Sequence, residues 1–335
     1  MKIHTSSSLK TLRQAGKVSC LILVGCILAE KSVDFGWAEN TSLCHSDLMS
    51  GTTDKMIYLL TECIDRENAD STKKEDSKAE LYFRRASVYN NAKKYSEALD
   101  DVGVAIKLNP KRGGFYALHA YILTGLKKYE EALEVIKAAV TIQRYDNREY
   151  SELYNVQGVA LKNLERLSEA IESYSQAIRF NPAAHIHRNR AISYKKQGKN
   201  RPVSDSKKAD EDYKLALQDL NEADKMKSYD FETLKYRGQI YLFLKDYPKS
   251  IADFSNAINI NPNDCSLYAD RGYAYGKVGQ EELAIKDKTK SLEVLNPGKK
   301  ISVGMDGNVT INEKVGMGGY QIRLCLDPGA SFSMK

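Results

Sequence analysis

A pattern of small and aromatic residues returns along this sequence every 34 residues, as from Ala86 to Ala120 and from Gly238 to Gly272. At 335 residues the chain exceeds the usual size of a single hydrophobic core. A solenoid avoids that limit, because each repeat contacts only its neighbours. The repeat therefore predicts a stack of similar units.

The unit at 151–184 predicts two short helices joined by a turn. Tyr154, Gly158 and Leu161 recur at spacings of four and three, which places them on one stripe of a first helix. A second stripe follows, and the Asn-Pro pair at 181–182 ends it, because proline disfavours helix in the residue before it. Each unit is thus expected to be an αα-hairpin.

Six units share this register, and the same position of the first helix holds a small residue in each. Its occupants are Ala86, Ala120, Gly158, Ala191, Gly238 and Gly272. The pattern resembles the tetratricopeptide repeat (TPR) family over about 79–298. The resemblance implies an all-α, right-handed α-solenoid of antiparallel helix pairs with a short β-rich C-terminal tail. The repeats are expected at 79–112, 113–146, 151–184, 184–228, 231–264 and 265–298.

The fourth repeat is longer than the others. Ala191 and Ala216, its two small residues, lie about thirteen residues further apart than Ala86 and Ala98 do in the first repeat. The extra residues fall within 199–212, which has no apolar periodicity and a proline near its start. They predict either a solvated loop or an extension of the second helix.

The first 38 residues have the features of a secretory signal peptide. Basic residues precede an apolar run of roughly twelve residues, too short for a membrane span, which needs about 20. Cleavage after Ala38 is the main expectation. A lipoprotein box ending at Cys26, which would be lipidated, is the alternative, and an uncleaved anchor is a third. We expect an exported bacterial protein, either periplasmic or anchored to the membrane by lipid.

Residues 39–78 are expected to form an N-terminal cap that includes a helix at 54–66. Cys44 and Cys63 flank its start, and in an exported protein such a pair predicts a disulfide. A similar Cys pair in exported bacterial repeat proteins supports this pairing by resemblance. Two buried free thiols remain the alternative, because spacing alone does not fix connectivity. Cys265 and Cys325 are a second possible pair.

The charge balance gives no reason to expect nucleic acid as a partner. Lys and Arg number 50 against 44 Asp and Glu, a net charge of +6. Removal of residues 1–38 leaves 45 − 42 = +3. The excess is therefore partly a property of the targeting segment.

The resemblance implies that a peptide or protein partner binds the concave face lined by the first helices. Within the family's groove positions we select Tyr121, Asn155, Arg188, Asn189, Lys195, Lys235 and Gln239. The basic members, with Lys196, predict affinity for an acidic or extended peptide through charge-assisted hydrogen bonds. A solvated basic face without a ligand is the alternative.

Two classes of ligand are disfavoured by the sequence. Some family members grip a C-terminal carboxylate with Lys and Asn on one repeat, Asn on the next, and Lys and Arg on a third, and no three repeats of this chain reproduce that set. His185 and His187 have no Cys or acidic cluster at metal spacing, so they are interpreted as surface residues and no metal or other cofactor is expected.

Residues 299–335 leave the helical pattern. An alternating segment around Asp306-Gly307 predicts a β-hairpin. The later Leu-Asp-Pro-Gly-Ala-Ser resembles the catalytic loop of retroviral-type (clan AA) aspartic peptidases, with Asp327 on the catalytic aspartate. Pro328 replaces the usual Thr or Ser, and the lobe is incomplete in this sequence, so a truncated remnant is favoured over an unrelated hairpin.

The function predicted is an exported, non-enzymatic scaffold that binds a protein or peptide partner. The alternative is a TPR-linked aspartic peptidase, truncated in this sequence and without catalytic activity. A third possibility is an array that packs against copies of itself.

Overall fold

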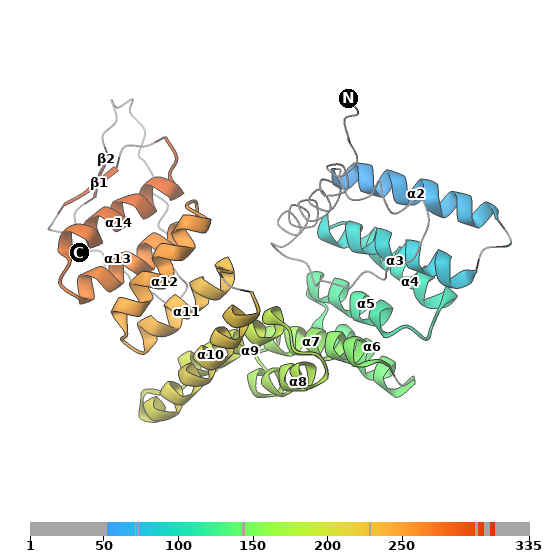
Figure 1. The fold of residues 1–335 in the computed structure, drawn as a ribbon, viewed down its shortest axis with the longest axis horizontal. Coiled ribbons are helices and arrows are strands. Elements are labelled where there is room, and N and C mark those ends of the chain that lie inside the picture. The colour runs from blue at the N-terminus through green and yellow to red at the C-terminus, as the bar shows by residue number, and fades with distance from the viewer. Residues whose placement is uncertain are drawn as a thin grey trace, which may run out of the picture. The chain divides into compact units, whose positions relative to one another are not determined.

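The computed structural model describes residues 52–298, except 71, 73, 143–144 and 228, and in addition residues 301–304 and 309–311. Over these residues the chain is a succession of α-helices joined by short turns and followed by two short strands (Figure 1). The chain divides into two compact units, one ending at Ala160 and the other beginning at Leu161. None of the described helices is both long and apolar enough to cross a membrane.

The elements begin with α2, since residues before it lie outside the described part of the chain. Their bounds are α2 Thr53–Ala69, α3 Glu75–Asn91, α4 Tyr95–Leu108, α5 Gly113–Gly125, α6 Tyr129–Ile142, α7 Asn147–Asn163, α8 Leu167–Phe180, α9 Ala184–Asn200, the 3-10 turn η1 Val203–Asp205, α10 Ser206–Met226, α11 Phe231–Phe243, α12 Tyr247–Ile260, α13 Cys265–Lys277, α14 Glu281–Leu295, β1 Ile301–Val303 and β2 Val309–Ile311.

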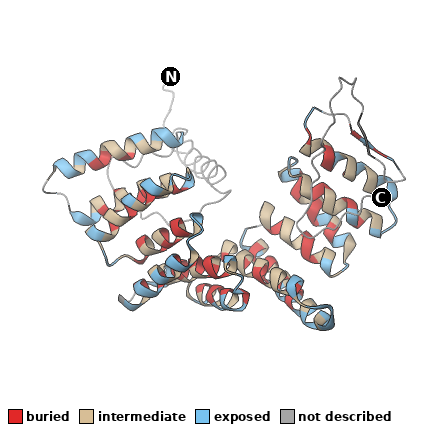
Figure 2. Cartoon of the chain, turned by 180° about the vertical axis from the view of Figure 1, so that it is seen from behind, coloured by how far each residue is buried: buried red, intermediate tan, exposed pale blue. Residues whose placement is uncertain are grey.

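The helical repeat predicted from the sequence is confirmed. Consecutive helices pack in pairs, such as α3 with α4, α9 with α10, α11 with α12 and α13 with α14. The second helices bury one stripe and expose the opposite side, whereas first helices such as α5 and α11 are buried or half-buried along almost their whole length, as Figure 2 shows by colour. The fold is therefore all-α over the repeats.

Small residues let the paired helices approach closely. Ala86, Ala98 and Ala105 of the first repeat are fully buried between α3, α4 and α5, together with Phe115 and Leu118. A larger side chain at these positions would hold the helices apart.

The turn inside every hairpin except that of α9 and α10 has one residue in the left-handed region. Lys93, Lys127, Glu165 and Lys245 have φ near +60°, and Gly279 has φ +76° at the same place in the sixth repeat. Their amides bond to carbonyls at the end of the first helix, for example Lys245 N to Leu242 O at 3.0 Å. The turns therefore cap the first helix in the same way.

Helix α2 packs on the first repeat as a single helix. Its buried residues Leu60, Cys63 and Ile64 contact Leu81 and Val88 of α3. Thr61 of α2 accepts a hydrogen bond from Arg85 Nη1 at 3.0 Å. Serines in the second helices of two later repeats accept the same bond, so α2 takes the place of a second helix in front of α3.

The insertion in the fourth repeat lengthens both helices around a short connection that contains η1. Helix α9 has 17 residues and α10 has 21, whereas α11 has 13 and α12 has 14. Arg201 Nε bonds to Asp212 Oδ2 at 2.5 Å across the connection. Tyr213 stacks on Phe243 with ring centroids 4.8 Å apart, which ties the lengthened hairpin to the next repeat. The helix-extension alternative describes this segment, and α9 is lengthened as well.

The described part of the tail is a small antiparallel ladder. β1 pairs with β2 in the register Ile301 with Ile311, and Ile301 and Val303 pack with Leu292 of α14. The predicted signal peptide, Cys26, Cys44, Cys325 and Asp327 all lie outside the described residues.

Candidate partner-binding face

Polar side chains join the first helices of the fourth, fifth and sixth repeats. Arg188 on α9 reaches forward to Asp230, at 2.5 Å, at the start of α11. Lys235 on α11 likewise reaches Asp264, at 2.6 Å, at the start of α13. These contacts repeat one device, in which a cation of one first helix binds the N-cap aspartate of the next.

The two aspartates are placed by helix capping. Asp230 accepts hydrogen bonds from Thr233 N at 3.1 Å and Thr233 Oγ1 at 2.8 Å. Asp264 accepts from Ser266 N at 3.0 Å and Ser266 Oγ at 2.6 Å. An aspartate is favoured at this position because it satisfies amide groups that have no partner within the helix. Lys235 of the preceding repeat binds the other oxygen of Asp264, whereas Arg188 shares Oδ2 of Asp230 with Thr233.

Ion pairing at these caps lowers the pKa of both carboxyl groups. Burial raises the pKa of Asp230, but the charge of Arg188 and the bonds from Thr233 outweigh it, so the pKa lies below the usual value. Burial also opposes ionisation of Asp264, and bonds from Lys235 and Ser266 again lower its pKa overall. Both groups therefore stabilise the folded chain when they are ionised.

Acid is expected to weaken these caps. An unfolded aspartate has a pKa of about 3.9. Because the folded pKa of Asp230 is lower, its contribution is complete above about pH 4 and is lost as the pH falls through the folded pKa. Urea unfolding of Asp230→Asn should show lower stability at pH 7 and a weaker decline below pH 4. Asp210→Asn, at an exposed position of α10, controls for the loss of one charge. An unchanged acid slope in Asp230→Asn would mean that this carboxylate does not stabilise the cap.

A second connection runs along the same face. Lys195 Nζ on α9 donates to Gln239 Oε1 on α11 at 2.6 Å, and Gln239 Nε2 donates to Asp270 Oδ2 on α13 at 3.1 Å. Lys195 also lies 4.8 Å from the ring centroid of Tyr236. We call the two connections together, from Arg188 and Lys195 to Asp264 and Asp270, the polar ladder.

The structure brings four of the predicted site residues together and shows that two of the cations among them are already ion-paired. Arg188, Lys195, Lys235 and Gln239 all belong to the polar ladder, and Asn189 lies beside them on α9. Arg188 and Lys235 are each paired with a carboxylate, so the predicted basic patch is largely neutralised in place. The sequence does not reveal this, since the pairing aspartates are 42 and 29 residues away.

Two further predicted residues, Tyr121 and Asn155, lie in the unit that ends at Ala160. Tyr121 on α5 is half-buried. Asn155 on α7 is only 1% exposed, so it supports the interior rather than offering a surface to a partner. Gln239, at 7% exposed, likewise holds the polar ladder from within.

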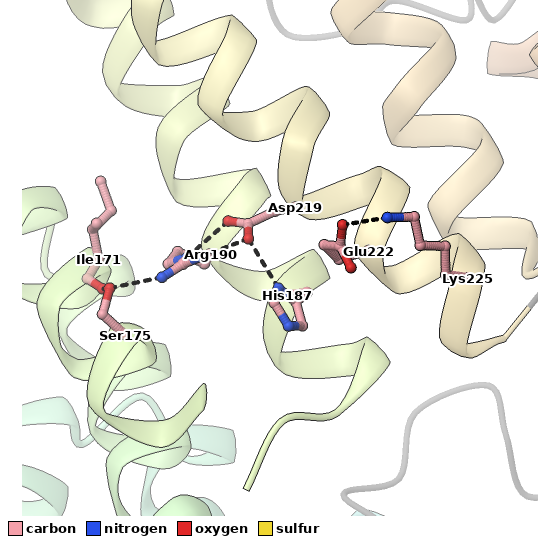
Figure 3. Close-up of polar contacts among 7 residues, drawn as sticks. All are labelled: Ile171, Ser175, His187, Arg190, Asp219, Glu222 and Lys225. Atoms are coloured by element: carbon pink, nitrogen blue, oxygen red, sulfur yellow. Dashed lines mark hydrogen bonds and ion pairs between the residues drawn. The ribbon is translucent and has the colours of Figure 1, made fainter. Parts of the chain in front are cut away.

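His187 corrects one interpretation made from the sequence. The prediction of a surface residue is wrong, because His187 is buried on α9, where Nδ1 lies 2.9 Å from Asp219 Oδ1 of α10. Arg190 binds the same carboxylate through Nε, at 2.8 Å to Oδ2, and Nη2, at 2.7 Å to Oδ1 (Figure 3). Among the described residues, no group of His, Cys, Asp and Glu is arranged to hold a metal ion.

An arginine–aspartate clamp recurs in four repeats and was missed in the sequence. Each clamp joins the first helix to the second by two hydrogen bonds and reaches back to the helix before. The pairs are Arg85–Asp101, Arg190–Asp219, Arg237–Asp253 and Arg271–Asp287. Three have a spacing of 16 residues, and the fourth has 29 because of the insertion. An Arg and an Asp 16 residues apart at the same position of several repeats is the sequence pattern that could have predicted the clamp.

Comparisons with known proteins agree with the repeat. A family model described as tetratricopeptide repeat matches residues 114–146 and 151–183, and one described as TPR repeat matches 238–279. The Hsp70-Hsp90 organizing protein 3 of Arabidopsis thaliana is 30% identical over 89 residues, which are 23% of this chain and 16% of that protein. The chain thus spans about a sixth of the length of this relative.

Solved structures of low sequence identity also match this chain. A tetratricopeptide repeat protein from Parabacteroides merdae is 17% identical, with a TM-score of 0.48, over 73% of this chain and 88% of its own. The TPR2AB-domain:pHSP90-complex of yeast Sti1 is 20% identical, with a TM-score of 0.35, over 65% of this chain and 91% of its own. The helical hairpins and the matches over residues 114–146, 151–183 and 238–279 show that this chain is all-α and contains tetratricopeptide repeats.

Proposed function

We propose that this chain is a non-enzymatic scaffold that binds an extended peptide or protein segment on the face formed by α9, α11 and α13. The observation that carries the proposal is the polar ladder, which links these three first helices to one another. A face held in register by its own side chains loses little conformational entropy when a partner binds.

The ladder also defines the chemistry of the partner. Arg188 and Lys235 already have carboxylate partners, so binding does not require a uniformly acidic ligand. Tyr273, 56% exposed on α13 with Lys277 5.2 Å from its ring centroid, offers an aromatic surface next to a cation. We propose a segment that combines polar main-chain contacts with an apolar or acidic side chain.

The relatives' partners are not carried over. The Arabidopsis relative is named for Hsp70 and Hsp90, and the Sti1 structure is a complex with pHSP90. The sequence of this chain lacks the Lys, Asn, Asn, Lys and Arg set with which some family members grip a C-terminal carboxylate. We therefore propose a partner other than a chaperone tail.

Exchange of one exposed tyrosine tests the face without disturbing the ladder. We expect Tyr273→Ala to weaken binding of a partner captured from an envelope fraction by about tenfold, because an aromatic contact in an interface is worth roughly 1–2 kcal/mol. Tyr58→Ala, which removes a 62% exposed tyrosine from α2, is the matched control. Binding is measured by titration calorimetry with the captured partner. Equal affinity of both variants would place the partner elsewhere.

The same experiment tests the peptidase alternative. Captured material is incubated with the unmodified chain and with Asp327→Asn. Cleavage that depends on Asp327 would replace the scaffold proposal by an enzymatic function.

We also propose that the segment at 1–38 directs export of the protein and that its cysteines form disulfides in an oxidising compartment. Support comes from the two cysteines within the described residues, Cys63 and Cys265, each of which is disulfide-bonded. Disulfides persist in oxidising compartments. The predicted partners, Cys44 and Cys325, lie outside the described residues.

Peptide mapping without reducing agent tests the pairing. We expect one cross-linked peptide that joins Cys44 to Cys63 and another that joins Cys265 to Cys325. Loss of the first bridge by Cys44→Ser should lower stability by about 2–4 kcal/mol. Free thiols at all four positions in protein isolated from the periplasm would contradict the proposal.

A further inference from the structure

The connection between α10 and α11 differs from the same connection in other repeats. After the first repeat, Asn109 Oδ1 accepts a hydrogen bond from Lys111 N at 3.0 Å. After the fifth, Asn261 Oδ1 accepts one from Asn263 N at 3.1 Å. Such a bond lets an asparagine side chain form part of a turn. The fourth repeat has Lys227 in place of this asparagine, and lysine has no acceptor, so the chain turns toward α11 in another way.

Tyr229 has a left-handed backbone conformation in this connection, with φ +57°. The corresponding residue after the fifth repeat is Asn263, whose φ is not positive. Apart from glycine, every other described residue with a positive φ lies in the turn inside a hairpin. A bulky side chain is disfavoured in this conformation because its Cβ atom crowds the neighbouring backbone. An aromatic residue therefore occupies a backbone position that suits glycine.

Packing of the ring does not offset this strain. Tyr229 is 70% exposed, and its side chain forms no hydrogen bond or aromatic contact with any residue that the structure describes. Met226, three residues earlier at the end of α10, is 47% exposed. Three residues of chain span at most about 11 Å, so two large, exposed side chains with apolar surface lie near each other. We call Met226 and Tyr229 the rim patch.

The rim patch adjoins the polar ladder. Asp230, which directly follows Tyr229, accepts a hydrogen bond from Thr233 N at 3.1 Å and another from Arg188 Nη1 at 2.5 Å. These bonds fix the end of the connection at the start of α11. The ring of Tyr229 is therefore presented beside the ladder.

The charged groups next to the rim patch in the sequence are already paired. Lys225 Nζ lies 2.6 Å from Glu222 Oε1, and Lys227 Nζ lies 3.5 Å from Asp230 Oδ1. The surface that the patch offers is therefore apolar rather than charged. Tyrosine and methionine are enriched where proteins bind one another, and the flexible methionine side chain adapts its shape to a partner.

We propose that the rim patch binds an apolar side chain of the partner segment, and that Tyr229 keeps an unfavourable backbone conformation in order to present its ring. The inference rests on the proposed function, because it assigns one apolar residue of the segment to the junction of the fourth and fifth repeats. Strained residues collect at binding sites, where the surrounding structure holds them. A residue better suited to the turn should therefore improve the fold and weaken binding.

The first measurement is the melting temperature of Tyr229→Gly. We expect a rise of about 1–3 °C, because glycine adopts this conformation without crowding, and the gain exceeds the cost of ordering a more flexible residue. Lys93→Gly, at an exposed residue with φ +60° in the first hairpin, should give a similar rise. A fall of several degrees in Tyr229→Gly alone would show that the ring stabilises the fold, and the proposal would be wrong.

The second measurement is peptide binding. The probe is a blocked heptapeptide of serine and asparagine with phenylalanine at its centre, compared with the same peptide with alanine there. The full chain carries ¹³C-methyl methionine, so that the Met226 resonance, assigned with Met226→Leu, reports on the rim patch. We expect the phenylalanine peptide to bind at least about fivefold more tightly. Tyr229→Gly should abolish this difference, whereas Tyr229→Phe and Lys93→Gly should keep it.

Several results would overturn the proposal. Equal binding of the two peptides, or a phenylalanine preference that survives in Tyr229→Gly, would show that the ring does not bind an apolar side chain. Loss of the preference in Tyr229→Phe would assign the contact to the hydroxyl group. Broadening of the Met226 resonance by vesicles of phosphatidylglycerol and phosphatidylethanolamine, without a response to either peptide, would assign the patch to a membrane surface.

The captured partner separates this inference from the function beneath it. Weaker partner binding in both Tyr273→Ala and Tyr229→Gly would support the two together. If Tyr273→Ala weakens binding and Tyr229→Gly does not, the scaffold stands and the rim patch is wrong. If neither variant changes the affinity, the proposed face itself is wrong.

Discussion

Replacement of Asp219 by alanine is expected to lower the free energy of unfolding by about 3–5 kcal/mol. The side chain of Asp219 is 3% exposed and accepts hydrogen bonds from Arg190 on one side, with His187 on the other (Figure 3). Without the carboxylate, a guanidinium that is 22% exposed loses its counterion and the imidazole loses its polar neighbour. The cost arises from these groups left behind rather than from the strength of the ion pair.

The same helix provides a matched control. Glu222, three residues further along α10, pairs with Lys225 Nζ at 2.6 Å, but their side chains are 39% and 70% exposed. Such surface pairs contribute about 0–1 kcal/mol. Glu222→Ala should therefore change stability by less than about 1 kcal/mol, although it also removes one carboxylate from α10. Urea unfolding followed by circular dichroism measures both variants.

A neutral replacement of the pair distinguishes the explanations. The third repeat has Gln157 and Ser173 where the fourth has Arg190 and Asp219. The double variant Arg190→Gln/Asp219→Ser leaves no buried arginine without a counterion, so it should be more stable than Asp219→Ala. If the double variant is the less stable of the two, the unpaired guanidinium is not the source of the cost, and Arg190 stabilises the fold through its other contacts, such as that with Ser175 Oγ.

The fold could be predicted from the sequence because a small set of repeat positions determines it. Alanine or glycine at one place in each first helix, as at Ala86 and Gly238, indicates that the two helices of a repeat pack closely. The 34-residue spacing indicates that the repeats stack on one another. The lengthened fourth repeat was detected, but the sequence did not decide between a loop and a helix extension. The capping ion pair of Arg201 with Asp212 and the stacking of Tyr213 on Phe243 are tertiary contacts that periodicity does not contain.

The candidate site was only partly accessible. Repeat positions placed Arg188 and Lys235 on first helices, and the structure has them on α9 and α11. Their ion pairing was not predicted, since each is bound by an aspartate that caps the next first helix. Likewise, His187 was expected at the surface because histidine is polar, whereas its position on the buried stripe of α9 places its ring against Asp219. Charge along a sequence does not reveal which charges are already paired.

The second large effect is expected at Gly238. A Cβ atom there would lie 2.8 Å from Phe254 Cε1 and 2.9 Å from Cδ1. Phe254 is fully buried in the core between α11, α12 and α13, so its ring has no free space to enter. Gly238→Ala should therefore lower stability by about 1–3 kcal/mol, although alanine is the better helix former.

At a second glycine, Gly103, replacement by alanine is expected to change stability in the opposite direction. Gly103 lies inside α4, and a Cβ atom there would meet nothing within 4 Å. Gly103→Ala should raise stability by about 0.5–1 kcal/mol, because it restricts the unfolded chain without a clash. The pair of variants separates the effect of packing from that of helix propensity.

The repeats themselves supply the compensating change. Where the first helix has alanine, the facing position of the second helix is aliphatic, as in Ala191 with Leu220, whereas Gly238 faces the aromatic Phe254. Phe254→Leu should therefore reduce the cost of Gly238→Ala. A double-mutant cycle in urea should give a coupling of about 1–2 kcal/mol, the size expected for residues in contact. Additive effects would mean that Phe254 moves aside, and that glycine at this position is not required by the aromatic ring.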